Sequence, residues 1–308
     1  MKYNFPVCPK KYGRIGGSSI GKGVVWITGA SSGLGLHTAL ALHKAGFDVI
    51  AGARSFVHCQ VPGADGIYRL PLDVTDKESI RHFIQNSLNI FPTVDALVNC
   101  AGILVLGSCE ETSADEFMGV MKTNFFGTAA MVKAVLPHMR KQRAGKIINF
   151  SSVLGLLGIP FQSAYTASKH AIEGYTECLA MEAAPFGIQV CLVEPGDHRG
   201  GSSAYRRWAE AVSTDSPYDL NFRKGIATIA HDEENGSDPD ILGNKVAKLL
   251  QRRRMPLRKR VAKFDQHLAV ILHSFIPARI MQFILTQYYL GKGETVHEEK
   301  KESHIGAQ

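Results

Sequence analysis

A tyrosine and a lysine stand four residues apart in the run Tyr165-Thr166-Ala167-Ser168-Lys169. On an α-helix, residues i and i+4 lie on one face, so these two side chains would face the same way. A phenol has a pKa of about 10 in water, and a neighbouring ammonium group lowers it because the charge stabilises the phenolate. The pair could therefore give or take a proton near neutral pH. The alternative is an ordinary surface tyrosine beside a solvated lysine.

A second chemical signal is the glycine-rich run Thr28-Gly29-Ala30-Ser31-Ser32-Gly33-Leu34-Gly35, between a predicted strand and a predicted helix. Gly29 permits a sharp turn, Gly33 lets the backbone approach a pyrophosphate, and Gly35 allows close packing of helix and sheet. The helix N-terminus presents free N–H groups to an anion. The spacing is GxxxGxG rather than GxGxxG, and the alternative is a simple turn. We assign the dinucleotide site to Gly29, Ser31, Ser32, Gly33, Leu34 and Gly35.

The elements that position these motifs follow from alternating apolar and helical patterns. Strands are predicted at Val24–Thr28, Asp48–Ala53, Ala96–Asn99, Lys146–Phe150 and Gln189–Val193, with a weaker one at Ile67–Leu70. Helices are predicted over about residues 34–45, 76–89, 116–141 and 164–185. Strands rich in Val and Ile that are separated by helices indicate βαβ units. We therefore expect a single Rossmann-like, doubly wound α/β domain, with a mostly parallel sheet of about seven strands and helices on both faces.

Three segments depart from this pattern. Residues 1–22 are expected to form an N-terminal arm ahead of a catalytic domain over 23–265. Within that domain, the polar segment 197–237 has the character of a loop that covers a substrate. Residues 266–308 are predicted to form a C-terminal helical extension and a charged tail. Pro277 and Arg279 interrupt the apolar stretch 268–290. This stretch could lie in a membrane interface beside the basic cluster at 252–260, but we favour a helix that covers the substrate cleft or packs between subunits.

Composition narrows the classes of function. The chain has 308 residues, 45% of them hydrophobic, and a formal net charge of +7, which excludes a disordered chain or a coiled coil. No stretch is apolar enough for several membrane spans. No recognition motif accompanies the positive charge, so nucleic-acid binding is not expected. The six cysteines include no CxxC pair, so no metal site is expected. The first 22 residues lack an apolar leader, and we expect a cytoplasmic protein.

Together these residues resemble the short-chain dehydrogenase/reductase family, whose glycine motif is TGxxxGxG, over about residues 23–265. By this resemblance Asp73 and Val74 contact the adenine. The run Asn99-Cys100-Ala101-Gly102 matches the family's NNAG turn, with Cys100 in place of the second asparagine, and Pro195-Gly196 matches the turn that supports the nicotinamide. The resemblance thus adds cofactor-binding residues to the glycine run, namely Asp73, Val74, Asn99, Ala101, Gly102, Tyr165, Lys169, Pro195 and Gly196.

The same resemblance implies four catalytic residues. Tyr165 exchanges a proton with the substrate oxygen, and Lys169 lowers the pKa of Tyr165 and contacts the ribose. Ser152, thirteen residues before Tyr165, holds that oxygen, and Ser151 is the competing candidate. Asn124 anchors a water on a proton relay to Lys169.

One departure concerns a threonine that the family places four residues after the glycine of the Pro-Gly pair. This chain has Gly200 there, with Ser202 and Ser203 nearby as possible substitutes.

The end of the second strand selects the cofactor. An acidic residue there would accept a hydrogen bond from a ribose hydroxyl and repel a 2′-phosphate. This chain has Ala53, Arg54 and Ser55 instead, and an arginine can hold a phosphate. We favour NADP(H), and NAD(H) stays possible.

Apolar residues flank the expected site, which suits a hydrophobic ketone or alcohol; they are Ile103, Leu104, Leu154, Leu156, Leu157, Ile159, Pro160 and Phe161. The run from Phe150 to Gly174 resembles hydroxysteroid dehydrogenases of the 17β and 20β types, so we expect a steroid. The alternatives are a fatty-acyl or general carbonyl reductase and, more remotely, a non-catalytic dinucleotide sensor. The resemblance also implies a homodimer or homotetramer.

Overall fold

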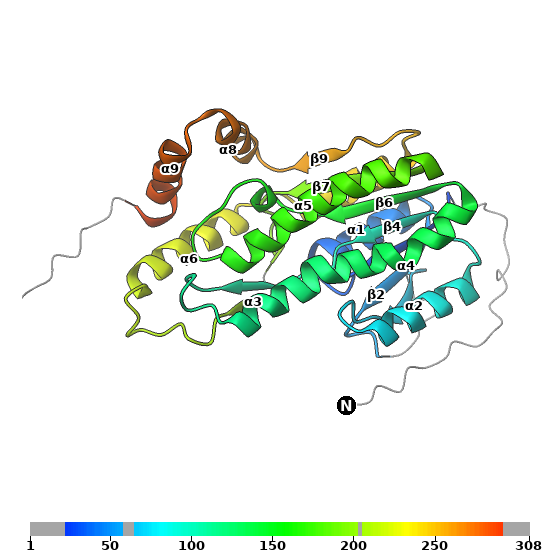
Figure 1. The fold of residues 1–308 in the computed structure, drawn as a ribbon, viewed down its shortest axis with the longest axis horizontal. Helices are drawn as coiled ribbons and strands as arrows, with labels where there is room; N and C mark the ends of the chain where they lie inside the picture. The colour runs from blue at the N-terminus through cyan, green and yellow to red at the C-terminus, as the bar shows by residue number, and fades with distance from the viewer. Residues whose placement is uncertain (1–21, 58–64, 203–204, 292–308) are drawn as a thin grey trace, which may run out of the picture.

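The computed structural model describes residues 22–57, 65–202 and 205–291, and these residues form a doubly wound α/β fold (Figure 1). The expected N-terminal arm, apart from Lys22, and the tail after Gly291 lie outside the described residues. A seven-stranded sheet, parallel throughout, confirms the predicted fold class. Its strands, in spatial order, are β3 (Tyr68–Pro71), β2 (Asp48–Ala53), β1 (Val24–Thr28), β4 (Ala96–Asn99), β6 (Gly145–Phe150), β7 (Ile188–Pro195) and β9 (Arg258–Val261).

Helices cover both faces of the sheet, which is why the central strands are buried on both sides. One face carries α2 (Lys77–Ile90), α4 (Gly127–Gln142) and α5 (Ser163–Ala183); the other carries α1 (Gly33–Lys44) and α7 (Pro239–Gln251). Alternate residues of β1 enter the two cores, with Trp26 on the α2–α4 side and Val25 and Ile27 on the α1–α7 side. The chain therefore has one domain with two apolar layers.

The pair α1 and α7 packs unusually closely, because α7 presents a glycine to α1. A Cβ atom built on Gly243 would lie 2.6 Å from the carbonyl oxygen of His37 and 3.0 Å from the Cβ of Ala41. At the edge of this contact, His37 Nδ1 lies 2.6 Å from Asp240 Oδ1. The close approach holds α1, and with it the glycine-rich turn, against the sheet.

The predicted helical stretch over residues 116–141 is confirmed, but it is not one regular α-helix. The structure has α3 (Ala114–Met121), a π-helical turn (Lys122–Phe126) and then α4. A π-turn adds one residue at a single point of the helix, and the pattern before it and the pattern after it are each helical, so the sequence was interpreted as one helix.

Strand β9 was not predicted, because its residues, Arg258 to Val261, are mostly basic. Glu194 of the neighbouring strand β7 is buried and accepts hydrogen bonds at 3.0 Å from both Arg258 and Arg260. Arg258 also pairs with Glu173 of α5. Buried carboxylates on two other elements therefore allow an arginine-rich strand to complete the sheet.

The segment 197–237 contains regular structure as well as loops. Strand β8 (Arg206–Trp208) pairs in parallel with β5 (Leu104–Leu106), and α6 (Asp219–Glu234) follows. The C-terminal extension forms two helices, α8 (Phe264–Phe275) and α9 (Ala278–Leu290), which Pro277 separates as predicted. In Figure 1, α6, α8 and α9 gather at the end of the sheet toward which the arrows of β7 and β9 point.

Replacing Gly243 with alanine should lower the free energy of unfolding by about 1–3 kcal/mol, since the new methyl group meets the backbone of α1. Gly119→Ala in α3 is the matched control, because no heavy atom lies within 4 Å of its built Cβ. The control should be neutral or stabilising by up to about 1 kcal/mol. Urea denaturation of both variants measures the difference, and equal effects would contradict the close packing of α1 on α7.

Candidate active site

A cavity of about 570 Å³ opens at the carboxyl ends of the strands, across β1 and β4, where the strand order reverses. In doubly wound folds this is where ligands bind. Most predicted site residues line it: Gly29, Ser31, Ser32, Leu34, Gly35, Arg54, Asp73, Val74, Ala101, Gly102, Ser152, Tyr165, Lys169, Pro195 and Gly196. Three predicted residues do not line it, namely Gly33, Asn99 and Asn124.

The glycine-rich turn is tied to the turn after β4. Thr28 Oγ1 accepts hydrogen bonds from the N–H groups of Cys100 and Ala101, both at 3.1 Å. Gly29 has φ +68, and a Cβ atom there would lie 2.6 Å from Ala101 Cα, so only glycine fits. Gly33 also has a positive φ, and its built Cβ would lie 3.2 Å from the carbonyl oxygen of Gly201. The two turns form one wall of the cavity.

The wall is suited to a dinucleotide. Ser32 precedes α1 with an extended backbone and makes no side-chain capping bond, so the first-turn N–H groups of α1 stay available to an anion. Asp73, which the resemblance places beside the adenine, lines the cavity, and one of its oxygens accepts hydrogen bonds from Thr75 at 2.7 and 2.9 Å. Arg54 stands exposed at the end of β2 on the cavity rim. These residues fit the diphosphate and adenosine parts of NAD(P).

Helix α5 brings Tyr165 and Lys169 to the same wall. Lys169 is buried, and its Nζ donates a hydrogen bond of 2.8 Å to the carbonyl oxygen of Phe150, the last residue of β6. The Nζ atom lies 5.4 Å from the centre of the Tyr165 ring. Spacing along the helix and burial against β6 thus set the distance between ammonium and phenol.

In the protein alone the pKa of Tyr165 is raised, and the expected lowering by Lys169 together with an oxidised nicotinamide stays a prediction for the cofactor-bound enzyme. Burial raises this pKa, a hydrogen bond with Ser152 opposes that shift, and the charges of Glu233 and Asp197 raise it further. Lys169 alone does not offset this burial. For Lys169, burial lowers the pKa to about 8, against the opposing influences of Cys100 and Glu173. Tyr165 is therefore protonated at neutral pH in the protein alone, which is the form that can donate a proton to a carbonyl oxygen.

Ser152 and Ser151 are separated by their surroundings. Ser152 interacts with Tyr165, accepts a hydrogen bond from the Leu154 N–H at 3.1 Å, and has only a long contact of 3.5 Å to the Pro195 carbonyl as donor. Its hydroxyl hydrogen can therefore serve a substrate. Ser151 also lines the cavity but interacts with Glu173, beneath the site.

Asn124 lies behind the cavity wall, in the π-helical turn. Its side chain exchanges hydrogen bonds with the Ile103 backbone, at 2.8 and 3.0 Å, and donates another to Ser168 at 3.0 Å. It joins the segment after β4 to α5, and a role in a water relay stays a prediction. Asn99 is likewise buried and donates to Asn149 at 2.9 Å.

The substrate side combines apolar and acidic residues that sequence reasoning mostly missed. Of the predicted apolar residues, Leu104, Leu154, Leu157 and Ile159 line the cavity, whereas Ile103, Leu156, Pro160 and Phe161 do not. Further lining residues come from α8 and α9: Leu268, Ala269, Leu272, Met281, Ile284, Leu285, Tyr288 and Tyr289. Besides Asp73, four carboxylates line it, those of Asp197, Asp232, Glu233 and Asp265. Of these four, only Asp197 lies next to a sequence motif, the Pro-Gly pair, that could have indicated its place in the site.

The carboxylates are held by neighbours. Asp197 interacts with Gln266, and burial together with Asp232 and Glu233 raises its pKa to about 6. Asp232 accepts a hydrogen bond from Tyr288 at 2.8 Å. Glu233 forms a salt bridge with Arg206 and accepts a hydrogen bond from Ser202. The hydroxyl group of Ser202, one of the two candidates to replace the family's threonine, is therefore bonded to Glu233. Ser203 lies outside the described residues.

Comparison with known proteins agrees with this geometry. Residues 23–207 match the family model described as short chain dehydrogenase. The chain is a short-chain dehydrogenase/reductase. A 3-ketodihydrosphingosine reductase from Bacteroides thetaiotaomicron is 39% identical over 266 residues, covering 86% of this chain and 97% of that protein. Dehydrogenase/reductase SDR family member 7B from Xenopus tropicalis is 31% identical over 280 residues, covering 87% and 86%.

The crystal structure of a short-chain dehydrogenase from Streptomyces avermitilis is 32% identical and superposes with a TM-score of 0.71, over 86% of this chain and 96% of that one. Members of this family are NAD(P)-dependent oxidoreductases that act on a CH–OH group or on the corresponding carbonyl. The chemistry that a bound nicotinamide supplies is hydride transfer at carbon. Among the described residues, no group of His, Cys, Asp and Glu could hold a metal ion.

Substituting Ser152 with alanine should lower kcat about 100-fold, because it removes the free donor beside Tyr165. Ser151→Ala, one residue away, should keep kcat near that of the unmodified enzyme. Steady-state kinetics with thermal unfolding of both variants separates catalysis from stability. A larger loss of kcat in Ser151→Ala would reverse the assignment.

The ratio kcat/KM for the reduced cofactor should fall as pH rises through about 8. It reports the free enzyme, in which Lys169 loses its ammonium charge over that range. Lys169→Arg keeps the positive charge to much higher pH, so its residual activity should lack this alkaline decline. The same decline in that variant would assign it to another group.

Proposed function

We propose that this enzyme uses NADPH to reduce a ketone on a bulky apolar substrate that carries hydrogen-bond donors beside its carbonyl. The observation that carries this proposal is one cavity that joins Ser152, Tyr165 and Lys169 to an apolar wall and to four carboxylates. In this proposal Tyr165 donates its proton to the carbonyl oxygen while Ser152 donates a hydrogen bond to it. The protonated form of Tyr165 is the one that donates the proton in this step.

The preference for NADPH rests on the end of β2. Ala53, Arg54 and Ser55 line the cavity there, and none is acidic, so nothing in this run repels a 2′-phosphate. Arg54 is exposed and has the planar donor group that binds phosphate in bidentate fashion.

The requirement for donor groups rests on the carboxylates. Glu233 and Asp197 line the same cavity as Tyr165, and their charges raise its pKa. Both are half-buried and each already has a protein donor, Arg206 for Glu233 and Gln266 for Asp197, but a carboxylate can accept further hydrogen bonds. A hydroxyl or ammonium group on the carbon next to the carbonyl would supply such a donor.

Two substrate classes have this chemistry. A 20-keto steroid with a hydroxylated side chain is favoured by the resemblance of residues 150–174 to hydroxysteroid dehydrogenases. A long-chain 2-amino ketone is favoured by the name of the Bacteroides relative. Both join an apolar body to a polar group at the ketone, whereas a fatty-acyl thioester has no donor beside its keto group.

The test is NADPH consumption with pairs of ketones that differ only in the neighbouring donor. The pairs are a 20-keto steroid with and without side-chain hydroxyls, and a long-chain 2-amino ketone with its N-acylated derivative; a 3-oxoacyl thioester completes the set. The donor-bearing member should have a kcat/KM about tenfold higher, as one charge-assisted hydrogen bond predicts. Asp232→Asn should reduce the tenfold difference in kcat/KM between the two members of a pair, because it removes one of the negative charges at the site.

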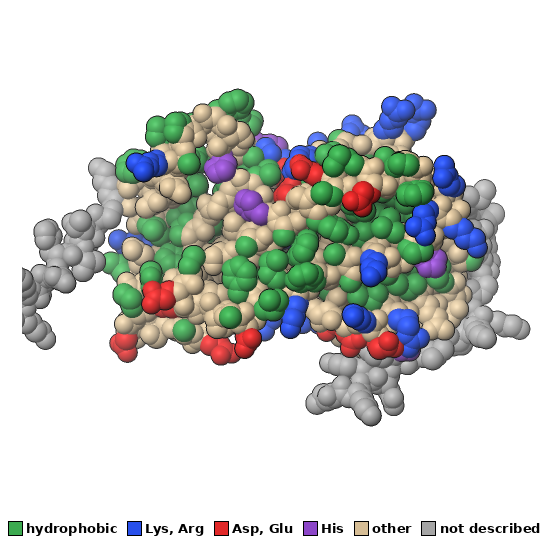
Figure 2. All heavy atoms as spheres, viewed as in Figure 1, with side chains coloured by type: hydrophobic (Ala, Val, Ile, Leu, Met, Phe, Trp, Pro, Cys, Tyr) green, Lys and Arg blue, Asp and Glu red, His purple; other side chains and the backbone are tan. Residues whose placement is uncertain are grey.

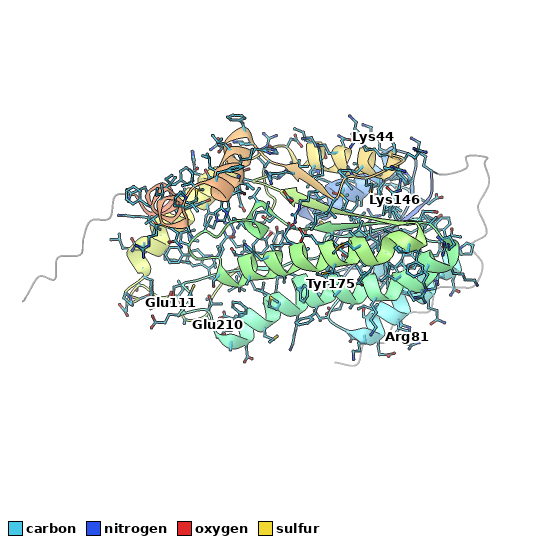
Figure 3. The ribbon with its side chains drawn as sticks, turned by 45° about the horizontal axis from the view of Figure 1, so that its top comes forward. Lys44, Arg81, Glu111, Lys146, Tyr175 and Glu210 are labelled. Atoms are coloured by element: carbon cyan, nitrogen blue, oxygen red, sulfur yellow. The ribbon has the colours of Figure 1, made fainter. Side chains whose placement is uncertain are left out.

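Variants tie turnover to the site. Tyr165→Phe should abolish turnover, while Tyr175→Phe should not. Tyr175 lies on the same helix (Figure 3), and its ring packs edge-on against that of Phe125. Arg54→Ala should raise the KM for NADPH about tenfold and leave that for NADH unchanged. Turnover of the thioester alone would replace the proposal with an acyl reductase. No turnover of any ketone would favour a non-catalytic dinucleotide sensor.

A further inference from the structure

The outer face of α8 and α9 is apolar and exposed. In α8, Phe264, Leu268, Ile271 and Phe275 are spaced by four, three and four residues, so they form one stripe along the helix. Phe264 and Phe275 are each 82% exposed. The exposed large apolar residues of α9 are Ile280, Phe283, Ile284 and Tyr288, and Arg279, Gln282 and Thr286 are exposed between them. Figure 2 shows hydrophobic side chains gathered over this part of the molecule. A patch of this kind on a single chain marks an interaction surface.

These two helices are held to the core by few buried side chains. Only Val270 in α8 and only Met281 in α9 are buried. Helices with so little buried surface gain little stability from the core. Contact of their outer face with another apolar surface would bury more of their side chains and so stabilise the two helices.

The segment of chain that carries α8 and α9 is strongly basic. Residues 252–290 contain eight Lys and Arg residues but one acidic residue, Asp265. Arg258 and Arg260 are paired with glutamates, while Arg252, Arg253 and Arg254 are exposed in the loop before β9. This loop lies along the same edge of the molecule as α8, and basic side chains project from that edge in Figure 2.

The patch is continuous with the cavity. Leu268, Ile284 and Tyr288 line the cavity and are also 41%, 44% and 53% exposed, so they form a rim where the cavity meets the outer surface. A substrate that passes between α8 and α9 would move from the apolar outer patch to the apolar lining of the cavity without crossing water.

We propose that α8 and α9 form a monotopic contact with an anionic lipid bilayer and that the apolar substrate enters the cavity from the bilayer between them. Exposed phenylalanines at both ends of α8 would insert among the acyl chains, and the arginine loop would contact anionic head groups. No helix among the described residues could cross a bilayer. The polar residues that break the stretch 268–290 exclude a span and are compatible with a helix lying in the interface.

A second copy of the chain is the competing occupant. A twofold contact brings the same surface of two copies together, so the basic region of one copy would lie against the basic region of the other. An anionic bilayer instead complements that charge. The entry route rests on the proposed function, whereas the bilayer contact does not.

The experiment is flotation of the full-length enzyme with vesicles of phosphatidylcholine alone and with vesicles containing phosphatidylglycerol, in the absence of any ketone. The enzyme should float with the anionic vesicles and at least tenfold less with the neutral ones. The double variant Phe264→Ser/Phe275→Ser should lose about tenfold or more in vesicle partitioning, because it removes two large apolar anchors. Neither residue lines the cavity, so its activity on a detergent-free, water-soluble ketone should be unchanged.

Met181→Ser is the matched control, since Met181 is an apolar residue of α5 that is 70% exposed. This variant should float like the unmodified enzyme. With a ketone dissolved in the vesicles, the double variant should lose turnover while Met181→Ser keeps it.

Flotation that is absent in the unmodified enzyme, or unchanged in the double variant, would overturn the proposal. A dimer that dissociates in the double variant without any flotation would assign the patch to a second copy. Flotation without turnover of any ketone would leave the bilayer contact standing and remove the proposed function.

Discussion

The hydrogen bond from the buried Lys169 ammonium to the Phe150 carbonyl fixes the geometry on which the site depends. An ammonium group away from water needs a strong acceptor, and the last carbonyl of β6 supplies it. This bond docks the first turns of α5 on the end of the sheet. Tyr165, one turn earlier, is thereby held beside Ser152, at the place where the carboxyl ends of β1, β4 and β6 meet the glycine-rich turn.

Burial has opposite consequences for the two members of this pair. It lowers the pKa of the lysine to about 8 and raises that of the tyrosine, so both shifts favour the neutral forms. The carboxylates of Asp197 and Glu233 add to the effect on the phenol. The protein alone thus holds Tyr165 in its protonated form, even though Lys169, with a pKa of about 8, is mostly charged at neutral pH.

The substrate side is built late in the chain and from distant segments. Residues of the β4–β5 region, α6, α8 and α9 meet around one apolar volume, and α8 and α9 present apolar surface both inward and outward. A helix that is apolar on two sides must be covered twice. The cavity accounts for the inner face, and the bilayer proposed above accounts for the outer face.

The sequence by itself determined what local spacing can determine. The distance of four residues between Tyr165 and Lys169, the glycines at 29, 33 and 35, and the alternation of strands and helices predict the fold class and most of the residues that line the cavity. Periodicity could not reveal the π-turn at Asn124, because the pattern before it and the pattern after it are each helical. It could not predict β9, whose arginines are stabilised by glutamates far away in the sequence.

The tertiary structure alone decided the sign of the pKa shift of Tyr165, the gathering of four carboxylates at the site and the exposure of the outer face of α8. Each depends on which atoms exclude water from a group, and that is a property of contacts between distant segments rather than of neighbours in the chain.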